Sequence, residues 1–120
     1  MNEILSDCLF PIILGSNTEG HACVRRMEKQ YGIGCTVLTG KRALTLRFLP
    51  DVRLLFAPPT LRDDILLQLL RDLDGESGLR LPLLITCDPA YLGFVERNRA
   101  ELEARFILRQ AMQILEGGRI

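Results

Sequence analysis

The residues of this chain with the most chemical potential lie in one loop near its start, Gly15-Ser-Asn-Thr-Glu-Gly20. An apolar run precedes the loop and a helical pattern follows it, which is typical of the strand–loop–helix unit where α/β domains bind ligands. The loop lacks the central glycine of a dinucleotide fingerprint, and His21-Ala22 stands where a P-loop needs Lys followed by Ser or Thr. Backbone N–H groups at the helix start could still hold a phosphate or carboxylate. Alternatively, Ser16, Asn17 or Thr18 only caps the helix.

Further candidates for ligand contact follow other apolar runs. Asp88 could orient a hydroxyl or an amine of a ligand, although its place before Pro89 also suits the N-cap of a helix. Lys41, with its neighbour Arg42, could bind an anion, or the pair belongs to a solvated loop. We expect Tyr91 to be a packing residue with its hydroxyl at the rim of the site.

Histidine and cysteine give little indication of catalysis or metal binding. His21 is not arranged with a serine and an acid as a triad, so we expect no general base and no catalytic residue. The four cysteines form no C-x-x-C pair and no cluster with the spacing of metal ligands. They are Cys8, Cys23, Cys35 and Cys87. We therefore expect reduced thiols, no metal site, and a buried Cys87 at the end of its strand.

Composition bounds the class of protein. The chain has 120 residues, of which 48% are hydrophobic and 25% charged, and these values predict a single globular domain over residues 1–120. The formal net charge of zero gives no attraction to nucleic acid or to an acidic membrane, and little repulsion that would oppose a homodimer. An acidic start and the lack of a long apolar run predict neither a secretory leader nor a membrane span, and hence a cytoplasmic protein.

Four short apolar runs predict the strands that must position these residues. The runs cover residues 10–14, 35–38, 52–57 and 81–86, and residues 43–49 fit either an extended segment or a helical turn. Because helical patterns separate the runs, we predict a three-layer, Rossmann-like α/β domain with a four-stranded parallel sheet. The first and fourth strands of such a fold are commonly neighbours, which would bring Gly15, Ser16 and Asn17 to face Cys87 and Asp88.

The helical patterns have recognisable starts and ends. They cover residues 19–31, a segment from Thr60 to about Leu73, residues 88–97, and a segment from Asn98 through residues 107–115 to Gly117-Gly118. Asp63 lies three residues after Thr60, and Glu101 lies three residues after Asn98, so both segments are predicted to begin with a capping box. The glycines after Tyr31 predict the end of the first helix.

Several segments resemble the N-terminal, pre-ATP-grasp domain of ATP-grasp carboxylate–amine ligases of the carbamoyl-phosphate-synthase-like or D-aspartate-ligase-like type. The first strand and loop, Phe10-Pro-Ile-Ile-Leu-Gly-Ser16, and the helix ending in Tyr31-Gly32 carry the first part of the resemblance. The segment Leu83-Leu-Ile-Thr-Cys-Asp-Pro-Ala-Tyr91 looks like the family's fourth strand with its Cys-Gly-Asp-x-Tyr-like turn. The segment Asn98-Arg-Ala-Glu-Leu-Glu-Ala-Arg-Phe106 is similar to the family's Asn-Arg-x-Glu-Leu-x-x-x-Phe helix.

The resemblance implies a domain on the substrate side of a ligase cleft, with an ATP-grasp module as its partner in the full-length protein. That module would bind ATP and Mg²⁺, so this domain would need no cofactor of its own and would be inactive alone, as part of a longer ligase or as a separate N-terminal domain. The ligand would be a small carboxylate or amine. The candidate substrate-binding residues of this chain are Gly15, Ser16, Asn17, Lys41, Asp88 and Tyr91.

Two other classes of function stay open. The chain could be a free-standing Rossmann-like module that binds a small anion or a nucleotide in the same crevice, or regulates another protein through it. It could also be an oligomerisation domain with an empty crevice. An amine would face Asp88 and an anion would face the helix start near Gly15, with charge added by Lys41.

Overall fold

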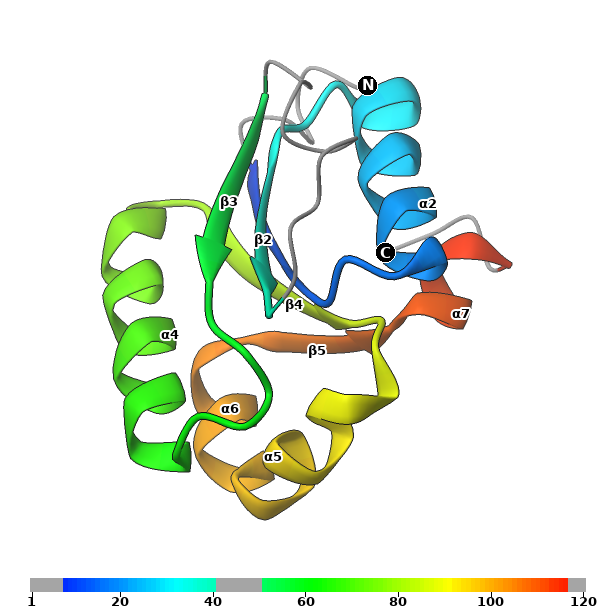
Figure 1. Ribbon diagram of the computed structural model, residues 1–120. Helices are drawn as coiled ribbons and strands as arrows, with labels where there is room; N and C mark the ends of the chain where they lie inside the picture. The colour runs from blue at the N-terminus through cyan, green and yellow to red at the C-terminus, as the bar shows by residue number, and fades with distance from the viewer. Residues whose placement is uncertain (1–7, 41–50, 117–120) are drawn as a thin grey trace.

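Five parallel strands form the centre of the molecule in a computed structural model that describes residues 8–40 and 51–116 (Figure 1). The strands are β1 (Leu9–Leu14), β2 (Cys35–Thr39), β3 (Val52–Phe56), β4 (Leu81–Thr86) and β5 (Ile107–Gln110). Their order in the sheet is β3-β2-β1-β4-β5, and each neighbouring pair is parallel. The predicted parallel α/β architecture is therefore confirmed.

The central strand β1 pairs with β2 on one side and with β4 on the other. Its six residues are all buried, because helices cover both faces of the sheet at this position. The chain winds from β1 outward to β3 and then crosses back to β4, so the direction of winding reverses between β1 and β4. In open α/β sheets, ligands bind outside the carboxyl ends of the strands near such a reversal.

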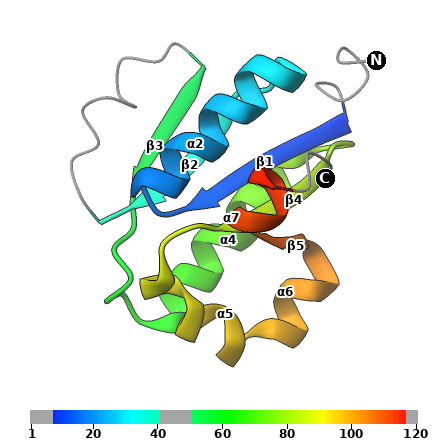
Figure 2. The same cartoon turned by 90° about the vertical axis from the view of Figure 1, so that its right-hand side faces the viewer.

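The helices form a layer on each face of the sheet (Figures 1 and 2). The first face carries α2 (Thr18–Arg26), which continues as a π-helical turn over Met27–Tyr31, and α7 (Ala111–Leu115). The second face carries α4 (Asp63–Ser77), α5 (Leu92–Arg97) and α6 (Arg99–Arg105). The three layers are consistent with the predicted Rossmann-like arrangement.

Each helical layer has its own hydrophobic core because alternate side chains of a strand point to opposite faces. Ile13 of β1 packs with Val24 and Met27 on the first face. Ile12 and Leu14 of β1 pack with α4 and α5 on the second face. All of these β1 side chains are completely buried, so β1 joins the two cores.

The prediction of four strands is wrong, because Ile107–Gln110 forms β5 and not a continuing helix. Phe106 takes an extended conformation at the end of α6, and the chain then pairs with β4 from Leu83–Ile107 to Thr86–Gln110. Ile107 packs against the hydrophobic core on the first face of the sheet, and Leu108 packs against the core on the second face. Two adjacent apolar residues fit a helix pattern and also fit an edge strand between two helical layers, and tertiary pairing decides for the strand.

Two predicted helix starts are also wrong in detail. Helix α4 begins at Asp63, after a turn over residues 59–61, and no side chain caps it. Asn98 precedes α6 without a capping bond, because its side-chain amide donates to Asp63 Oδ2 at 2.9 Å and to the Phe94 carbonyl at 2.9 Å. The side chains of Asp63 and Asn98 therefore bind each other between α4 and α6 and do not cap their own helices.

The other predicted boundaries agree with the structure to within one residue for the first four strands. The first helical segment ends at Gly32, as predicted, in a left-handed conformation with φ of 67°. Asp88 caps the helical turn Pro89–Tyr91, because its Oδ1 accepts the Ala90 N–H at 3.0 Å. The predictions for Lys41, Arg42 and residues 43–49 lie outside the described residues.

No helix among residues 8–40 and 51–116 is long and apolar enough to cross a membrane.

Candidate functional site

The loops after β1 and β4 meet directly at the point where the winding of the sheet reverses. The carbonyl of Leu14 accepts the N–H groups of Cys87 and Asp88 at 3.0 and 3.1 Å. On the other side, the N–H of Gly15 donates to the carbonyl of Leu38, the partner of Leu14 in β2, at 2.9 Å. The predicted juxtaposition of the first loop with Cys87 and Asp88 is therefore present.

Close backbone packing explains both glycines of the Gly15–Gly20 loop. Gly15 has φ of 113°, and a Cβ there would lie 2.4 Å from Cβ of Asp88. A Cβ on Gly20 would lie 2.3 Å from the carbonyl oxygen of Gly15. Only glycine fits at these two places, so their spacing follows from the packing of the loop and does not require a phosphate.

Asn17 is the residue that caps the first helix, which resolves the open choice among Ser16, Asn17 and Thr18. Its Oδ1 accepts the Gly20 N–H at 2.9 Å, and its Nδ2 donates to the Cys87 carbonyl at 3.2 Å. One side chain thus caps α2 and fastens the first loop to the end of β4. Asn17 positions the loops around the site.

A cavity of about 460 Å³ lies at the carboxyl ends of β1, β2 and β3, beside the turn that follows β4. We call it the β1–β3 cavity. Its lining residues are Gly15, Ser16, Thr39, Gly40, Pro58, Pro59, Thr60, Asp88, Ala90 and Tyr91. Ser16 Oγ and Thr39 Oγ1 form a hydrogen bond of 2.6 Å across the ends of β1 and β2. The lining therefore combines hydroxyl groups and one carboxylate with the apolar rings of the prolines.

Tyr91 lines this cavity with a buried side chain. The prediction of a hydroxyl at the rim is wrong. The side chain is 1% exposed, and its hydroxyl donates to the carbonyl of Ala57 at 2.7 Å. Burial, with a smaller contribution from the charge of Asp88, raises the pKa of Tyr91 to about 12. The hydroxyl is therefore protonated at neutral pH and ties the turn after β4 to the end of β3.

Four of the predicted substrate-binding residues line this one cavity, namely Gly15, Ser16, Asp88 and Tyr91. Asn17 lies next to it and holds the two loops together, and Lys41 lies outside the described residues. At the helix start, Asn17 takes up the Gly20 N–H, which is one of the N–H groups that the prediction offered to an anionic ligand.

The candidate list missed Thr39, Gly40, Pro58, Pro59, Thr60 and Ala90, which also line the cavity. Most of them directly follow β2 or β3, so the rule that ligands bind at the carboxyl ends of strands was a signal for them. Gly40 approaches Pro58 closely, since a Cβ on Gly40 would lie 2.9 Å from Cβ of Pro58. That approach brings the loops after β2 and β3 together and depends on tertiary structure.

The described cysteines and histidine form no candidate metal centre. Within residues 8–40 and 51–116, no group of three or more His, Cys, Asp and Glu side chains could hold a metal ion. Cys87 is buried, as predicted, and its thiol donates to the sulfur of Cys23 at 3.6 Å. This contact lowers the pKa of Cys23 and raises that of Cys87. Burial raises the pKa of Cys35 to about 12, so Cys35 is an unreactive core residue.

The described lining of the β1–β3 cavity contains one carboxylate and no cationic side chain. Phosphate groups in proteins are commonly held by cations or by free backbone N–H groups. Among the described residues, the charged group of this lining therefore suits a cationic ligand group.

Comparisons with family models, with curated proteins and with solved structures give no match to this chain.

Proposed function

We propose that this domain binds a small molecule with an amino group in the β1–β3 cavity, as the substrate-side domain of an ATP-dependent carboxylate–amine ligase. The position of Asp88 in the cavity lining is the observation that best supports an amine ligand. Asp88 contributes the only charge in the described lining and stands beside the hydroxyl groups of Ser16 and Thr39.

The hydrogen bonds of Asp88 favour an amine over an anion. Its Oδ1 accepts the Ala90 N–H, which fixes the side chain at the cavity and leaves Oδ2 without a hydrogen bond among the described residues. A carboxylate accepts hydrogen bonds and an ammonium group donates them, so the two are complementary in charge and in hydrogen bonding. The prolines at positions 58 and 59 offer an apolar surface for the rest of the ligand.

The place of this site in a ligase is supported by the sequence resemblance of residues 9–106 to pre-ATP-grasp domains. In this proposal the ATP-grasp module supplies the sites for ATP and Mg²⁺, and this domain supplies the pocket for the amine. The proposal agrees with the described lining, which has a carboxylate for an amine and no cation for a phosphate.

A titration of isotope-labelled protein with small amines and amino acids tests the binding step. We expect ethanolamine and alanine to shift the backbone amide signals of Gly15, Ser16 and Ala90, while acetate and ATP leave them unchanged. Asp88→Asn is the sharpest variant, because asparagine can still accept the Ala90 N–H as an N-cap but carries no charge. We expect this variant to lose the response to amines and to keep its fold.

Asp72→Asn provides the matched control, because Asp72 is an exposed acid on α4 and does not line the cavity. Equal responses to amines in Asp88→Asn and in Asp72→Asn would show that Asp88 does not recognise the amine. No shift with any amine in the wild-type protein would contradict binding by the domain alone.

A free-standing ligand-binding module is the second candidate, because the β1–β3 cavity is already formed in this domain. Joining the domain to an ATP-grasp partner separates the candidates. With a carboxylate co-substrate that accepts the phosphoryl group of ATP, amine-dependent release of ADP only in the joined protein supports the ligase. Amine binding without any effect on ATP turnover supports the module.

A further inference from the structure

A second cavity, of about 420 Å³, lies at the carboxyl ends of β4 and β5 and shares no lining residue with the first. We call it the β4–β5 cavity. Its lining residues are Thr86, Leu92, Val95, Glu96, Arg99, Leu108, Arg109, Gln110 and Gln113. Thr86 and Gln110 are directly paired residues at the ends of the two strands. The proposed function assigns no role to this cavity.

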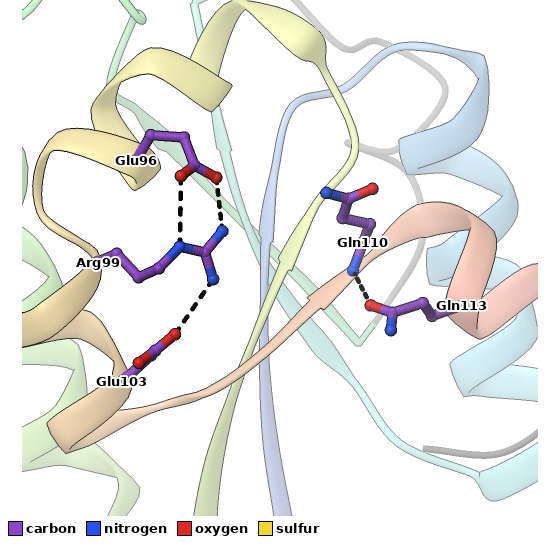
Figure 3. Close-up of polar contacts among 5 residues, drawn as sticks. All are labelled: Glu96, Arg99, Glu103, Gln110 and Gln113. Atoms are coloured by element: carbon purple, nitrogen blue, oxygen red, sulfur yellow. Dashed lines mark hydrogen bonds and ion pairs between the residues drawn. The ribbon is translucent and has the colours of Figure 1, made fainter.

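Arg99 forms the charged wall of the β4–β5 cavity on the side of α5 and α6 (Figure 3). Its guanidinium donates to both oxygens of Glu96, at 2.5 and 3.3 Å, and to Glu103 at 3.1 Å. Two carboxylates thus fix this side chain and take up its charge. Arg99, Glu96 and Glu103 together form a wall in which the guanidinium charge is fully neutralised.

Gln110 and Gln113 form the opposite wall, and both of their side-chain NH₂ groups remain available to a ligand. The N–H of Gln110 donates to Gln113 Oε1 at 2.8 Å, and the side chain of Gln110 accepts the N–H of Gln113 in return. Each amide oxygen therefore accepts one hydrogen bond and keeps a second acceptor position, whereas each amide NH₂ group has no hydrogen-bond partner among the described residues and can donate to a ligand. In Figure 3 the side-chain amide nitrogen of Gln110 points toward the side on which Arg99 lies.

Arg109 is the second cation in the lining of the β4–β5 cavity. This half-buried residue of β5 donates to the carbonyl of Leu108 at 2.8 Å and has no acidic partner among residues 8–40 and 51–116. Because Glu96 and Glu103 neutralise Arg99, Arg109 is the cation of this lining that stays free to pair with an anion. The hydroxyl of Thr86 adds another possible donor at the end of β4.

An apolar strip completes the lining, formed by Leu92 and Val95 of α5 and by Leu108 of β5. We propose that the β4–β5 cavity binds a short aliphatic carboxylate, with its anionic group on Arg109 and the glutamine amides and its chain on this strip. The guanidinium of Arg109, which has no acidic partner among the described residues, matches one carboxylate, and the free amide groups donate to its oxygens. The strip would have no partner in a fully hydrated inorganic ion.

Titration with butyrate, followed by backbone amide shifts, tests this site. We expect Thr86, Val95, Gln110 and Gln113 to shift with butyrate at millimolar concentration, because so small a ligand has limited binding energy. Butylamine has the same chain with the opposite charge, and we expect it to leave these signals unchanged. Equal shifts with both compounds would overturn the carboxylate assignment, as would shifts with inorganic phosphate and none with butyrate.

Arg109→Gln separates the role of the charge from the shape of the cavity. We expect the Kd for butyrate to rise at least about tenfold, because a charge-assisted hydrogen bond is lost. Arg53→Gln is the matched control, since Arg53 also lies on an edge strand but in β3, away from this cavity. An unchanged Kd in folded Arg109→Gln, or an equal rise in Arg53→Gln, would overturn the proposal. The signals of Gly15 and Ala90 report on the first cavity, so the two sites fail or succeed separately.

Discussion

The two cavities at the carboxyl edge of the sheet are built from different parts of the polypeptide. The β1–β3 cavity depends on close backbone approaches, of Gly15 to Asp88 and of Gly40 to Pro58. The β4–β5 cavity depends on long polar side chains, above all Glu96, Arg99 and the glutamines. Substitutions of Gly15 or Gly40 in the first cavity should therefore disturb folding, whereas substitutions of the charged side chains in the second should change charge and leave the fold intact.

Gly15→Ala is the strongest test of this difference. The new Cβ would lie 2.4 Å from Cβ of Asp88, and φ at this position is 113°. Overpacking and backbone strain together predict a loss of roughly 3–5 kcal/mol in the free energy of unfolding. Urea denaturation followed by circular dichroism measures this loss.

Gly32→Ala is the control for backbone conformation alone. Gly32 also has a positive φ, of 67°, but a Cβ there would meet nothing within 4 Å. We expect a loss of about 1 kcal/mol from this variant. Similar losses for Gly15→Ala and Gly32→Ala would mean that the approach of Gly15 to Asp88 does not constrain the first cavity.

The sequence predicted four of the five strands because each is a continuous apolar run between turn signals. It did not predict β5, since Ile107 and Leu108 also continue the helical spacing of the preceding segment. The start of α4 at Asp63 was missed for a related reason. The carboxylate of Asp63 accepts hydrogen bonds from Arg97 and Asn98, which lie 34 and 35 residues away. Such distant partners cannot be recognised from local spacing.

Prediction of the candidate site was good for position and poor for side-chain roles. The rule on strand ends placed Gly15 and Asp88 together, and the structure has them in contact. The sequence could not show that the side-chain oxygen of Asn17 would accept the Gly20 N–H while its nitrogen donates to the Cys87 carbonyl. It also gave no sign of the β4–β5 cavity, because that cavity needs the unpredicted strand β5.

Tyr91→Phe tests whether the first cavity also depends on a buried hydrogen bond. The variant removes the donor to the Ala57 carbonyl, and Ala57 is completely buried, so we expect a loss of about 1–3 kcal/mol in the free energy of unfolding. The pKa of Tyr91 is about 12 in the folded protein and 10.0 ordinarily. This raised pKa contributes stability that is complete below pH 10 and is lost as the pH rises toward 12.

Unfolding of the wild type and of Tyr91→Phe should therefore be compared at pH 9 and at about pH 11. We expect the difference in unfolding free energy between the two proteins to shrink at the higher pH. A difference that stays constant with pH would mean that Tyr91 ionises as easily in the folded state as in the unfolded state.

Asp63→Asn tests how firmly the helices over the second cavity are held. Arg97 donates twice to the carboxylate of Asp63 and Asn98 donates once, and these bonds lower the pKa of Asp63 to about 2. A lowered pKa contributes stability that is present above the ordinary value of 3.8 and is lost as the pH falls toward 2. We expect Asp63→Asn to unfold more easily than the wild type at pH 6, with a smaller difference near pH 2. Equal acid sensitivity of the two proteins would contradict this linkage, and Asp72→Asn is the control.

Arg99→Gln should have the smallest effect on stability. Its ion pairs with Glu96 and Glu103 are on the surface, and such pairs contribute little because solvent screens them. We expect an unchanged melting temperature, but the pKa of Glu96 should rise toward its ordinary range, since Arg99 is what holds it low. Titration of the Glu96 carboxyl carbon by NMR measures that rise. An unchanged pKa of Glu96 would contradict Arg99 as the cause of its low value. A large loss of stability would show that the second cavity is as strongly coupled to folding as the first.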